Sequence, residues 1–382
     1  MWGEWLLWIG LMSGTSADAT DAALVRIGED VRDLSLRCFR SFPLPVSLRQ
    51  RIHELAEAPV PLRDLVQIDV ELGARFADAA LALLEESGTR AQDVAGIGSH
   101  GQTVGHYPEV QGSLQLGAAA VIHERTKIPV VADFRAADLA AGGQGAPLTP
   151  FFHHAYFAQQ DEVRALLNIG GFTNVTYLPG LEPEQVVAFD PGPGNALIDR
   201  AARWASEGSA SFDRDGALAA QGKPDAEVVA ELLSDPYFAL TPPKSTGHEY
   251  FAAAHFAGAR ERVLERGGSP QDVLATLTQL TAESVADQAK RFFPSQPARW
   301  IVYGGGARNP VLLEMLREAL DPTPVELSAA YGVPIDALEA IAFAVLGWCA
   351  SRGETGNLPG ATGARHPAIL GTATPPGSFA SD

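Results

Sequence analysis

Apolar runs that end in glycine-rich turns recur along the chain and predict buried strands. They occupy residues 5–10 (WLLWIG), 94–103 (VAGIGSHGQT), 165–174 (ALLNIGGFTN) and 300–309 (WIVYGGGARN). The first and third runs continue into a second strand-like run, so each predicts a strand–turn–strand hairpin. Because these two hairpins lie roughly one domain length apart, they indicate an internal duplication of architecture.

Helix-like segments separate these strands. Apolar residues recur at helical spacing from Leu65 to Leu83, and the pattern ends at residues 87–88 (SG), which predicts a long helix. Ser269 and Pro270 predict the start of another helix, with the serine as N-cap and the proline at the first helical position. Strands interleaved with helices favour an α/β fold with mixed sheets.

Composition narrows the class of protein. With 46% hydrophobic and 19% charged residues, the chain is typical of a soluble globular protein. Its net charge of −18 argues against a nucleic-acid or membrane surface as partner, so any bound phosphate needs local donors. The apolar octet at residues 5–12 lacks a basic flank and is too short to span a bilayer. Cys38 and Cys349 show no metal-ligand spacing, which makes a reducing cytoplasm the simplest location. A homodimer is left open.

The length of 382 residues favours two domains. Residues 128–134 (IPVVADF) are typical of a last strand, and the Gly/Pro-rich segment after them is typical of a crossing between domains. We therefore expect one domain of residues 1–134 plus about 350–371, and a second of residues 135–349. The tail, residues 372–382, has a low-complexity composition and is expected to be disordered.

Three glycine-rich segments are candidates for an anion site. The turn at residues 13–21 is either a tight hairpin or a nest of backbone N–H groups and hydroxyls that holds a phosphate. The turn at 170–174 (GGFTN) would supply a second such element. In residues 304–316, three glycines follow a strand and Pro310 opens a helix. Glycine lets a ligand approach the backbone closely, and a helix N-terminus favours negative charge. No Walker motif occurs.

Two carboxylates stand out from their apolar surroundings. Asp190 follows a strand-like run and precedes a Gly-Pro-Gly loop, so it either points into a ligand crevice or is a turn or N-cap residue. Glu339 is the only charged residue in the helix-like segment 337–350. Its carboxylate either pairs with another polar group, lines a solvent-filled site, or faces water near the start of the helix.

Two further polar motifs each have two interpretations. His100, in the segment SHGQT, is either a hydrogen-bonded core histidine or a substrate contact. Lys244, Ser245 and Thr246 either contact anions or belong to a solvated loop.

Taken together, the chain resembles the anhydro-N-acetylmuramic acid kinase family from about Ile9 to Leu370. Nine segments occur in the family's order: GLMSGTSADATD, GSHGQTV, VADFRAADLAAGGQGAPLTPFFH, LLNIGGFTNVT, FDPGPGNALID, DGALAAQGKPD, DPYFALTPPKSTGHEYF, GGGARNP and GNLPGATGA. The resemblance implies the sugar-kinase/actin/heat-shock ATPase fold, with two ribonuclease-H-like domains and ATP in the interdomain cleft. It also implies that water opens the 1,6-anhydro bond of the sugar and that ATP phosphorylates the released 6-oxygen. The products would be N-acetylmuramic acid 6-phosphate and ADP, formed during cell-wall recycling.

The same resemblance implies roles for individual residues. Asp190 would be the base that activates water, and Glu339 a second carboxylate of the catalytic site. Nucleotide-binding residues would be Gly14, Thr15, Ser16, Asp18, Asp21, Gly170, Gly171, Asn174, Gly304, Gly305, Gly306 and Asn309. Substrate-binding residues would be His100, Gln102, Arg135, Gln144, Gly192 and Asn195. ATP would come with Mg²⁺ held by phosphates and water more than by protein carboxylates, since Met12 stands roughly where related kinases place a metal-linked aspartate.

Three positions depart from the family pattern. Ala19 replaces a customary glycine, which makes the nucleotide turn less permissive; Pro191 replaces a threonine, and Gly105 an arginine. Three alternatives to the anhydrosugar kinase are a hydrolase of the same fold, another sugar kinase, and a non-catalytic sugar sensor. ADP formation that strictly requires the anhydrosugar would separate the kinase from the hydrolase, and the retained Asp190 disfavours the sensor.

Overall fold

The computed structural model describes residues 5–14, 16–57, 60–247, 250–251 and 253–379. The chain divides into two compact units, one made of Met1–Phe157 and Asp336–Asp382 and the other of Ala158–Ile335. These boundaries differ from those expected at 134 and 350. The difference arises because helix α12, Leu338–Ser351, packs on strands of the first unit, and helix α5, Thr149–Phe157, packs on α12.

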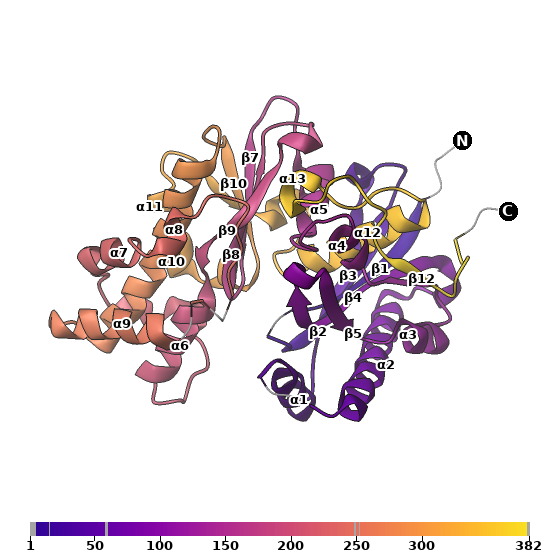
Figure 1. The fold of residues 1–382 in the computed structure, drawn as a ribbon, viewed down its shortest axis with the longest axis horizontal. Helices are drawn as coiled ribbons and strands as arrows, with labels where there is room; N and C mark the ends of the chain where they lie inside the picture. Colours follow the sequence, from indigo (N-terminus) through magenta and orange to yellow (C-terminus); the bar gives the residue numbers. More distant parts are fainter. Residues whose placement is uncertain (1–4, 15, 58–59, 248–249, 252, 380–382) are drawn as a thin grey trace. The chain divides into compact units, whose positions relative to one another are not determined.

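The first unit is built on a mixed sheet with the strand order β12-β6-β4-β1-β2-β3, and β5 pairs with β4 (Figure 1). Strands β1, β2 and β3 form an antiparallel meander, which β4 and β6 extend in parallel with β1. The strands are β1 Leu6–Ser13, β2 Ala19–Ile27, β3 Ser35–Pro43, β4 Val94–Tyr107, β5 Gly112–Leu116, β6 Val130–Ala132 and β12 Thr372–Thr374. The other helices of this unit are α1 Val46–Glu57, α2 Leu62–Ser87, α3 Ala119–Thr126, α4 Ala136–Ala140 and α13 Pro359–Thr362.

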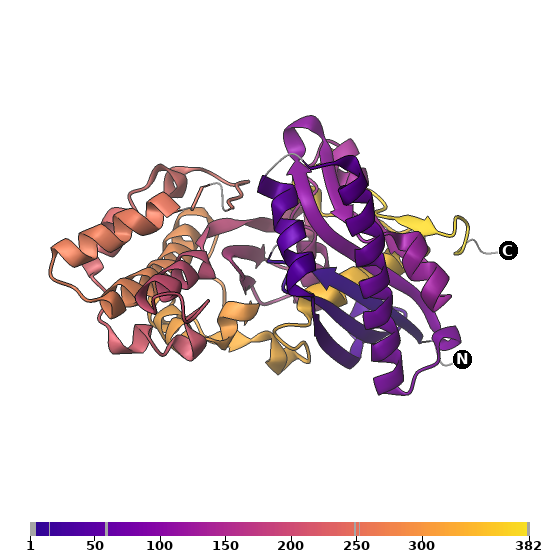
Figure 2. The ribbon, with the colours of Figure 1, turned by 90° about the horizontal axis from the view of Figure 1, so that it is seen from below.

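Helices cover both faces of this sheet. Ile9 and Leu11 of β1 lie in a core with the apolar face of α2, and Figures 1 and 2 show α2 and α3 side by side. Gly10 points to the opposite face, because successive strand residues alternate. A Cβ atom at Gly10 would lie 1.7 Å from the carbonyl oxygen of Ala340, and one at its register partner Gly98 would lie 1.9 Å from that of Phe343. Two neighbouring glycines thus let α12 lie directly on the strands.

The C-terminal segment is ordered where disorder was expected. Strand β12 pairs antiparallel with β6, and the ring of Phe379 stacks on that of Trp8 at 5.6 Å. Backbone pairing at the sheet edge and one aromatic contact hold a segment whose composition alone predicts disorder. The expectation of a disordered tail is therefore corrected for the described residues up to 379.

The second unit repeats the topology of the first. Its sheet has the order β11-β10-β7-β8-β9, with β7, β8 and β9 as an antiparallel meander and β10 and β11 added in parallel. The strands are β7 Arg164–Ile169, β8 Phe172–Leu178, β9 Val187–Pro193, β10 Arg299–Tyr303 and β11 Val325–Leu327. A meander extended by two parallel strands is the ribonuclease-H-like arrangement, so the expected duplication and the mixed α/β fold class are confirmed.

Helices of the second unit pack around α10, which crosses its core. The helices are α6 Asn195–Ala205, α7 Ala226–Leu232, α8 Pro236–Ala239, α9 Ala253–Glu265, α10 Pro270–Phe292 and α11 Pro310–Ala319. Ser269 caps α10 through a reciprocal bond pair with Asp272, as the sequence predicts. Of the helices described in either unit, none combines the length and apolar character that a bilayer crossing requires.

Candidate active site

Asp190 lies in β9, where its carboxylate is held from two directions. Asn174 Nδ2 donates to Oδ1 at 2.7 Å, and the backbone N–H of Thr246 donates to Oδ2 at 3.0 Å. The register shifts here, so that Asn174 of β8 opposes two residues of β9, Asp190 and Pro191. Such a bulge re-aims side chains, and it tolerates a residue without an N–H. Pro191 therefore fits the strand, and Asn174 orients the carboxylate.

The backbone of Asp190 is fixed as well. Its N–H donates to the carbonyl of Lys244 at 3.0 Å, and its carbonyl accepts from the hydroxyl of Tyr237 at 2.6 Å. Burial, and then the charge of Asp190, raise the pKa of Tyr237, so this phenol remains a donor. Both backbone groups and both carboxylate oxygens of Asp190 thus have defined partners.

Lys244 and Thr246 form part of this arrangement, whereas Ser245 between them is exposed. Lys244 Nζ donates to Gln288 Oε1 and to the carbonyl of Tyr237, and it lies over the rings of Tyr237 and Phe292 at 4.7 and 5.1 Å. Partial burial lowers the pKa of Lys244 to about 8. Because 56 residues separate Thr246 from Asp190, the sequence gives no local signal of this contact.

The turn between β7 and β8 is joined to the start of α6. The carbonyls of Gly170 and Gly171 accept from the N–H groups of Gly194, Asn195 and Ala196 at 2.9–3.0 Å. These first amides of α6 are therefore engaged within the protein. Gly171 itself is exposed, and a Cβ atom built on it would meet nothing within 4 Å.

Gly192 and Asn195, which were expected to contact the sugar, both have hydrogen-bond partners within the second unit. The N–H and carbonyl of Gly192 both bond to the hydroxyl of Thr173, at 3.1 and 2.9 Å. Gly192 is buried, and a Cβ atom there would lie 2.9 Å from the ring of Phe238. Asn195 is half-buried, and its Nδ2 makes a long contact of 3.5 Å with the carbonyl of Ile169.

The loop after β10 contains one open glycine between two packed ones. Gly304 has φ +86°, and a Cβ atom there would lie 2.3 Å from Asn168 Oδ1. A Cβ atom on Gly306 would lie 2.2 Å from Ile169 Cγ2, whereas Gly305 is exposed with open space beside it. Only Gly305 of the three therefore leaves room for a ligand against the backbone.

Asn309, expected to bind nucleotide, is the N-cap of α11. Its Oδ1 accepts from the N–H groups of Val311 and Leu312 at 3.0 and 3.1 Å, and the residue is 8% exposed. The side-chain oxygen thus satisfies the first turn of the helix.

In the first unit, the turn between β1 and β2 is hydrogen-bonded to β4. Ser13 Oγ donates to Gln102 Oε1 at 2.7 Å, and Gln102 Nε2 donates to the carbonyl of Gly14 at 3.2 Å. Gln102 is buried, so it holds the turn from within. Gly14 has no atom within 4 Å of a built Cβ, and Ser16 is exposed.

The remaining positions of this turn have different surroundings. Thr15 lies outside the described residues. Asp18 is exposed and pairs with Arg49 at 2.6 Å, while Ala19 begins β2 in extended conformation, where no glycine is required. Gly105, the third departure from the family pattern, pairs with Leu114 between β4 and β5.

In the first unit, the charge of Asp21 acts on the ionisation of Glu339. Desolvation of its carboxylate, and then the charge of Asp21, raise the pKa of Glu339 to about 7, while Arg135 opposes the shift. Burial also raises the pKa of Asp21, a hydrogen bond from Ser41 opposes it, and the charge of Asp336 adds to it. Glu339 is therefore neither a plain surface residue nor an ordinary helix-start carboxylate.

The buried His100 and the half-buried Arg135 form a pair, and the charge of Arg135 acts on Glu339. Arg135 Nη2 donates to His100 Nε2 at 2.8 Å, so Nδ1 carries the proton and donates to the carbonyl of Gly101 at 3.0 Å. Burial, and then the charge of Arg135, lower the pKa of His100 well below its usual range, so the ring is neutral. With both nitrogens engaged and the ring 4.4 Å from that of Phe343, His100 is a core histidine that orients Arg135.

Arg135 keeps donor capacity. Nη1 donates to the carbonyl of Gly145 at 2.6 Å, and Nε is buried without a hydrogen-bond partner among the described residues. Burial lowers the pKa of Arg135 to about 10, although the charges of Glu339 and Asp138 oppose this. Gln144, next to Gly145, is exposed.

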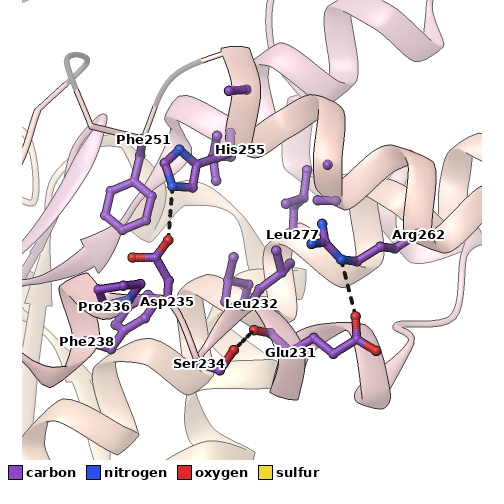
Figure 3. A pocket seen from close by; sticks show the side chains of 15 residues that line it. Glu231, Leu232, Ser234, Asp235, Pro236, Phe238, Phe251, His255, Arg262 and Leu277 are labelled. Carbon is purple, nitrogen blue, oxygen red and sulfur yellow. Dashed lines mark hydrogen bonds and ion pairs between the residues drawn. The ribbon is translucent and has the colours of Figure 1, made fainter.

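A pocket of the second unit lies among α7, α8, α9 and α10, with a volume of about 410 Å³. Figure 3 shows His255 and Arg262 at this pocket, where His255 Nε2 contacts Asp235 at 3.3 Å and Arg262 pairs with Glu231 at 3.2 Å. None of the residues expected at the active site lines it.

Two repeated units of ribonuclease-H-like topology, with open glycine turns, define the class of fold shared by sugar kinases and actin-like ATPases. A family model described as anhydro-N-acetylmuramic acid kinase matches residues 6–376. A relative of that name from Xanthomonas oryzae pv. oryzae is 45% identical over 380 residues, which cover 97% of each chain. One from Caldanaerobacter subterraneus subsp. tengcongensis is 41% identical over 378 residues, which cover 95% of each. The chain belongs to the anhydro-N-acetylmuramic acid kinase family, and it is a kinase of that family.

The comparison with solved structures also finds a match. The activator of 2-hydroxyisocaproyl-CoA dehydratase from Clostridium difficile, with bound ADPNP, matches with a TM-score of 0.45 and 12% identity, over 90% of this chain and 94% of that one.

Proposed function

We propose that the protein hydrolyses the 1,6-anhydro bond of 1,6-anhydro-N-acetylmuramic acid and phosphorylates the released 6-oxygen. The water oxygen bonds to the anomeric carbon, the bond from that carbon to the 6-oxygen breaks, and the 6-oxygen accepts the γ-phosphoryl group of ATP. The products are N-acetylmuramic acid 6-phosphate and ADP. The supporting observation is the fixed carboxylate of Asp190 in a chain of this kinase family.

Asp190 is proposed as the base that takes the proton from water. Oδ1 accepts from Asn174 and Oδ2 accepts from Thr246, and both hydrogen bonds favour the ionised carboxylate, which is the form that can take a proton. A base held by four bonds from neighbouring segments keeps its direction, which general-base catalysis requires.

Nucleotide binding is proposed at the open glycine turns. Gly14, Gly171 and Gly305 each leave space beside the backbone, so phosphate or adenosine can approach main-chain N–H groups. Phosphoryl transfer depends mainly on such positioning and on charge stabilisation. Mg²⁺ is proposed to arrive with ATP, held by phosphates and water, because this ion keeps several waters in most protein sites.

Arg135 and Glu339 are proposed to bind the sugar. The guanidinium of Arg135 is oriented by His100 and Gly145, and the second N–H groups of Nη1 and Nη2 are the proposed donors for a sugar oxygen. With a pKa of about 7, Glu339 can accept or donate a proton at neutral pH. The reaction is proposed to serve cell-wall recycling in the cytoplasm, and Cys38 and Cys349 are both unpaired thiols.

A coupled assay of ADP formation tests this function. Purified protein with ATP and Mg²⁺ should form ADP only when the anhydrosugar is present, and ADP should match sugar phosphate one to one. N-acetylmuramic acid, which lacks the anhydro bond, serves as the control sugar. Equal turnover of that sugar would indicate another sugar kinase, and ADP with free phosphate but no sugar phosphate would indicate a hydrolase.

A further inference from the structure

A buried carboxylate outside the proposed catalytic groups connects three separate segments of the first unit. Asp138, in α4, has no exposed surface. Its Oδ1 accepts from Asn357 Nδ2 at 2.6 Å and from Thr362 Oγ1 at 2.7 Å, and its Oδ2 accepts from the N–H of Gly145 at 2.8 Å. Two donors from a segment 219 and 224 residues away and one from the loop after α4 thus converge on one side chain, which satisfies a charge that would otherwise be costly to bury.

The segment that follows α12 is built to supply these donors. Asn357 Oδ1 accepts from the N–H of Ala368 at 2.7 Å, which orients its amide so that Nδ2 faces Asp138. The carbonyl of Thr362 accepts from the N–H of Gln144 at 2.8 Å. The motif GNLPGATGA therefore contacts α4 through its side chains and the glycine-rich loop at residues 142–145 through its backbone.

The same loop holds the guanidinium that is proposed to bind the sugar. Gly145 donates its N–H to Asp138 and accepts from Arg135 Nη1 at its carbonyl. Arg135 in turn donates to His100. A continuous chain of hydrogen bonds thus leads from Thr362 and Asn357, through Asp138 and Gly145, to Arg135.

We propose that Asp138 is a positioning residue for sugar binding, and that Asn357 and Thr362 orient it so that Gly145 fixes Arg135. This inference rests on the proposed function for its kinetic consequence. Only a carboxylate suits the position, because the groups of Asn357, Thr362 and Gly145 that face it are all hydrogen-bond donors. An asparagine would offer one acceptor atom, and its own amide group would face one of these donors. Asp138, Asn357 and Thr362 are all buried, so we expect their effect on the sugar to pass through Arg135.

The test uses Thr362→Val, which removes one donor at nearly constant volume. We expect the KM for the anhydrosugar to rise roughly tenfold, as for loss of a hydrogen bond to a charged group, with the KM for ATP within about twofold of the original value. Thr126→Val is the matched control, because Thr126 is also buried in the first unit and its hydroxyl bonds to the carbonyl of Ile122 at 2.8 Å, away from this network. Both variants should lose similar thermal stability, and only Thr362→Val should change the sugar KM.

A double variant tests whether the effect passes through Arg135. In an Arg135→Lys background, adding Thr362→Val should change the sugar KM by less than about twofold, because the group it positions has been replaced. An undiminished tenfold effect in that background would overturn the proposed route. An unchanged sugar KM in Thr362→Val alone, with active wild-type protein, would overturn the inference itself.

A measurement without sugar separates this inference from the proposed function. In ¹⁵N NMR of the histidine rings, Thr362→Val should shift the Nε2 resonance of His100, assigned with His100→Gln, and Thr126→Val should leave it in place. If wild-type protein formed no ADP with the anhydrosugar, the proposed function would fail while this resonance still reported the linkage. An unmoved resonance in Thr362→Val would contradict the linkage whatever the substrate.

Discussion

The side-chain amide of Asn174 donates to Oδ1 of Asp190 at 2.7 Å, between two antiparallel strands whose register shifts at this point. The bulge brings the two side chains together, since one residue of β8 faces two of β9. A carboxylate that is fixed in this way keeps its direction, which the removal of a proton from one water molecule requires. The geometry therefore connects a local irregularity of the sheet with the chemistry proposed for Asp190.

Asp190→Asn should abolish turnover and leave nucleotide affinity nearly intact. The amide cannot accept a proton, and loss of a general base typically costs about 10²–10⁴ in rate. Turnover is measured by the coupled assay, and ATP affinity by titration calorimetry. A variant that kept more than about a third of the wild-type kcat would place the base elsewhere.

Asn174→Ala distinguishes an orienting role from nucleotide binding, which the sequence had suggested for this residue. Because Asn174 bonds to the base, we expect kcat to fall about tenfold while the KM for ATP changes by less than about twofold. Steady-state kinetics with each substrate varied in turn gives both values. Weaker ATP binding with an unchanged kcat would assign Asn174 to the nucleotide site and not to Asp190.

Gly305→Val and Gly306→Val should separate ligand binding from folding. The side chain at 305 would enter open space, so we expect weaker ATP binding with little change in Tm. At 306 it would meet Ile169 at 2.2 Å, which we expect to destabilise the second unit by about 1–3 kcal/mol. Calorimetric titration and thermal melts measure the two effects. Unchanged ATP affinity in Gly305→Val would remove this loop from the proposed nucleotide site.

The raised pKa of Glu339 predicts that the stability difference between the wild-type protein and Glu339→Gln depends on pH. Burial and Asp21 raise this pKa from 4.5 to about 7, so between these values the folded protein binds a proton that the unfolded chain has lost. Wild-type stability should therefore fall as pH rises through this window, whereas Glu339→Gln has no such titration. We expect the Tm of the variant relative to wild type to increase by roughly 3–8 °C from pH 4.5 to 7. A difference that stayed constant, or that grew toward low pH, would contradict the assigned pKa.

Local patterns in the sequence were sufficient to predict the repeated hairpins and several helix boundaries. Glycines between apolar runs mark the turns at residues 13–18 and 170–171, and the cap at Ser269 depends only on neighbouring residues. The limits of the units differ from those expected at 134 and 350, because the packing of α12 on β1 depends on Gly10 and Gly98, which are distant from it in sequence.

The polar contacts of the candidate site were harder to predict. Thr362 and Asp138 are separated by 224 residues, and such a pair leaves no periodic signal in the sequence. The sequence does not distinguish the three glycines at 304–306 from one another, because only packing in the folded protein leaves open space beside Gly305. Asn309 and Gln102 were assigned to ligands by resemblance, whereas their side chains bond within the protein.

Hydrolytic ring opening coupled to phosphorylation can be followed through the fate of labelled water. The reaction is run with ATP and 1,6-anhydro-N-acetylmuramic acid in ¹⁸O-water, quenched early with borohydride to prevent exchange at the anomeric carbon, and analysed by mass spectrometry. We predict one ¹⁸O atom on the anomeric carbon of N-acetylmuramic acid 6-phosphate, and an unlabelled oxygen bridging carbon 6 and phosphorus. Sugar phosphate without ¹⁸O, or ¹⁸O found in free phosphate in place of the sugar, would contradict the account.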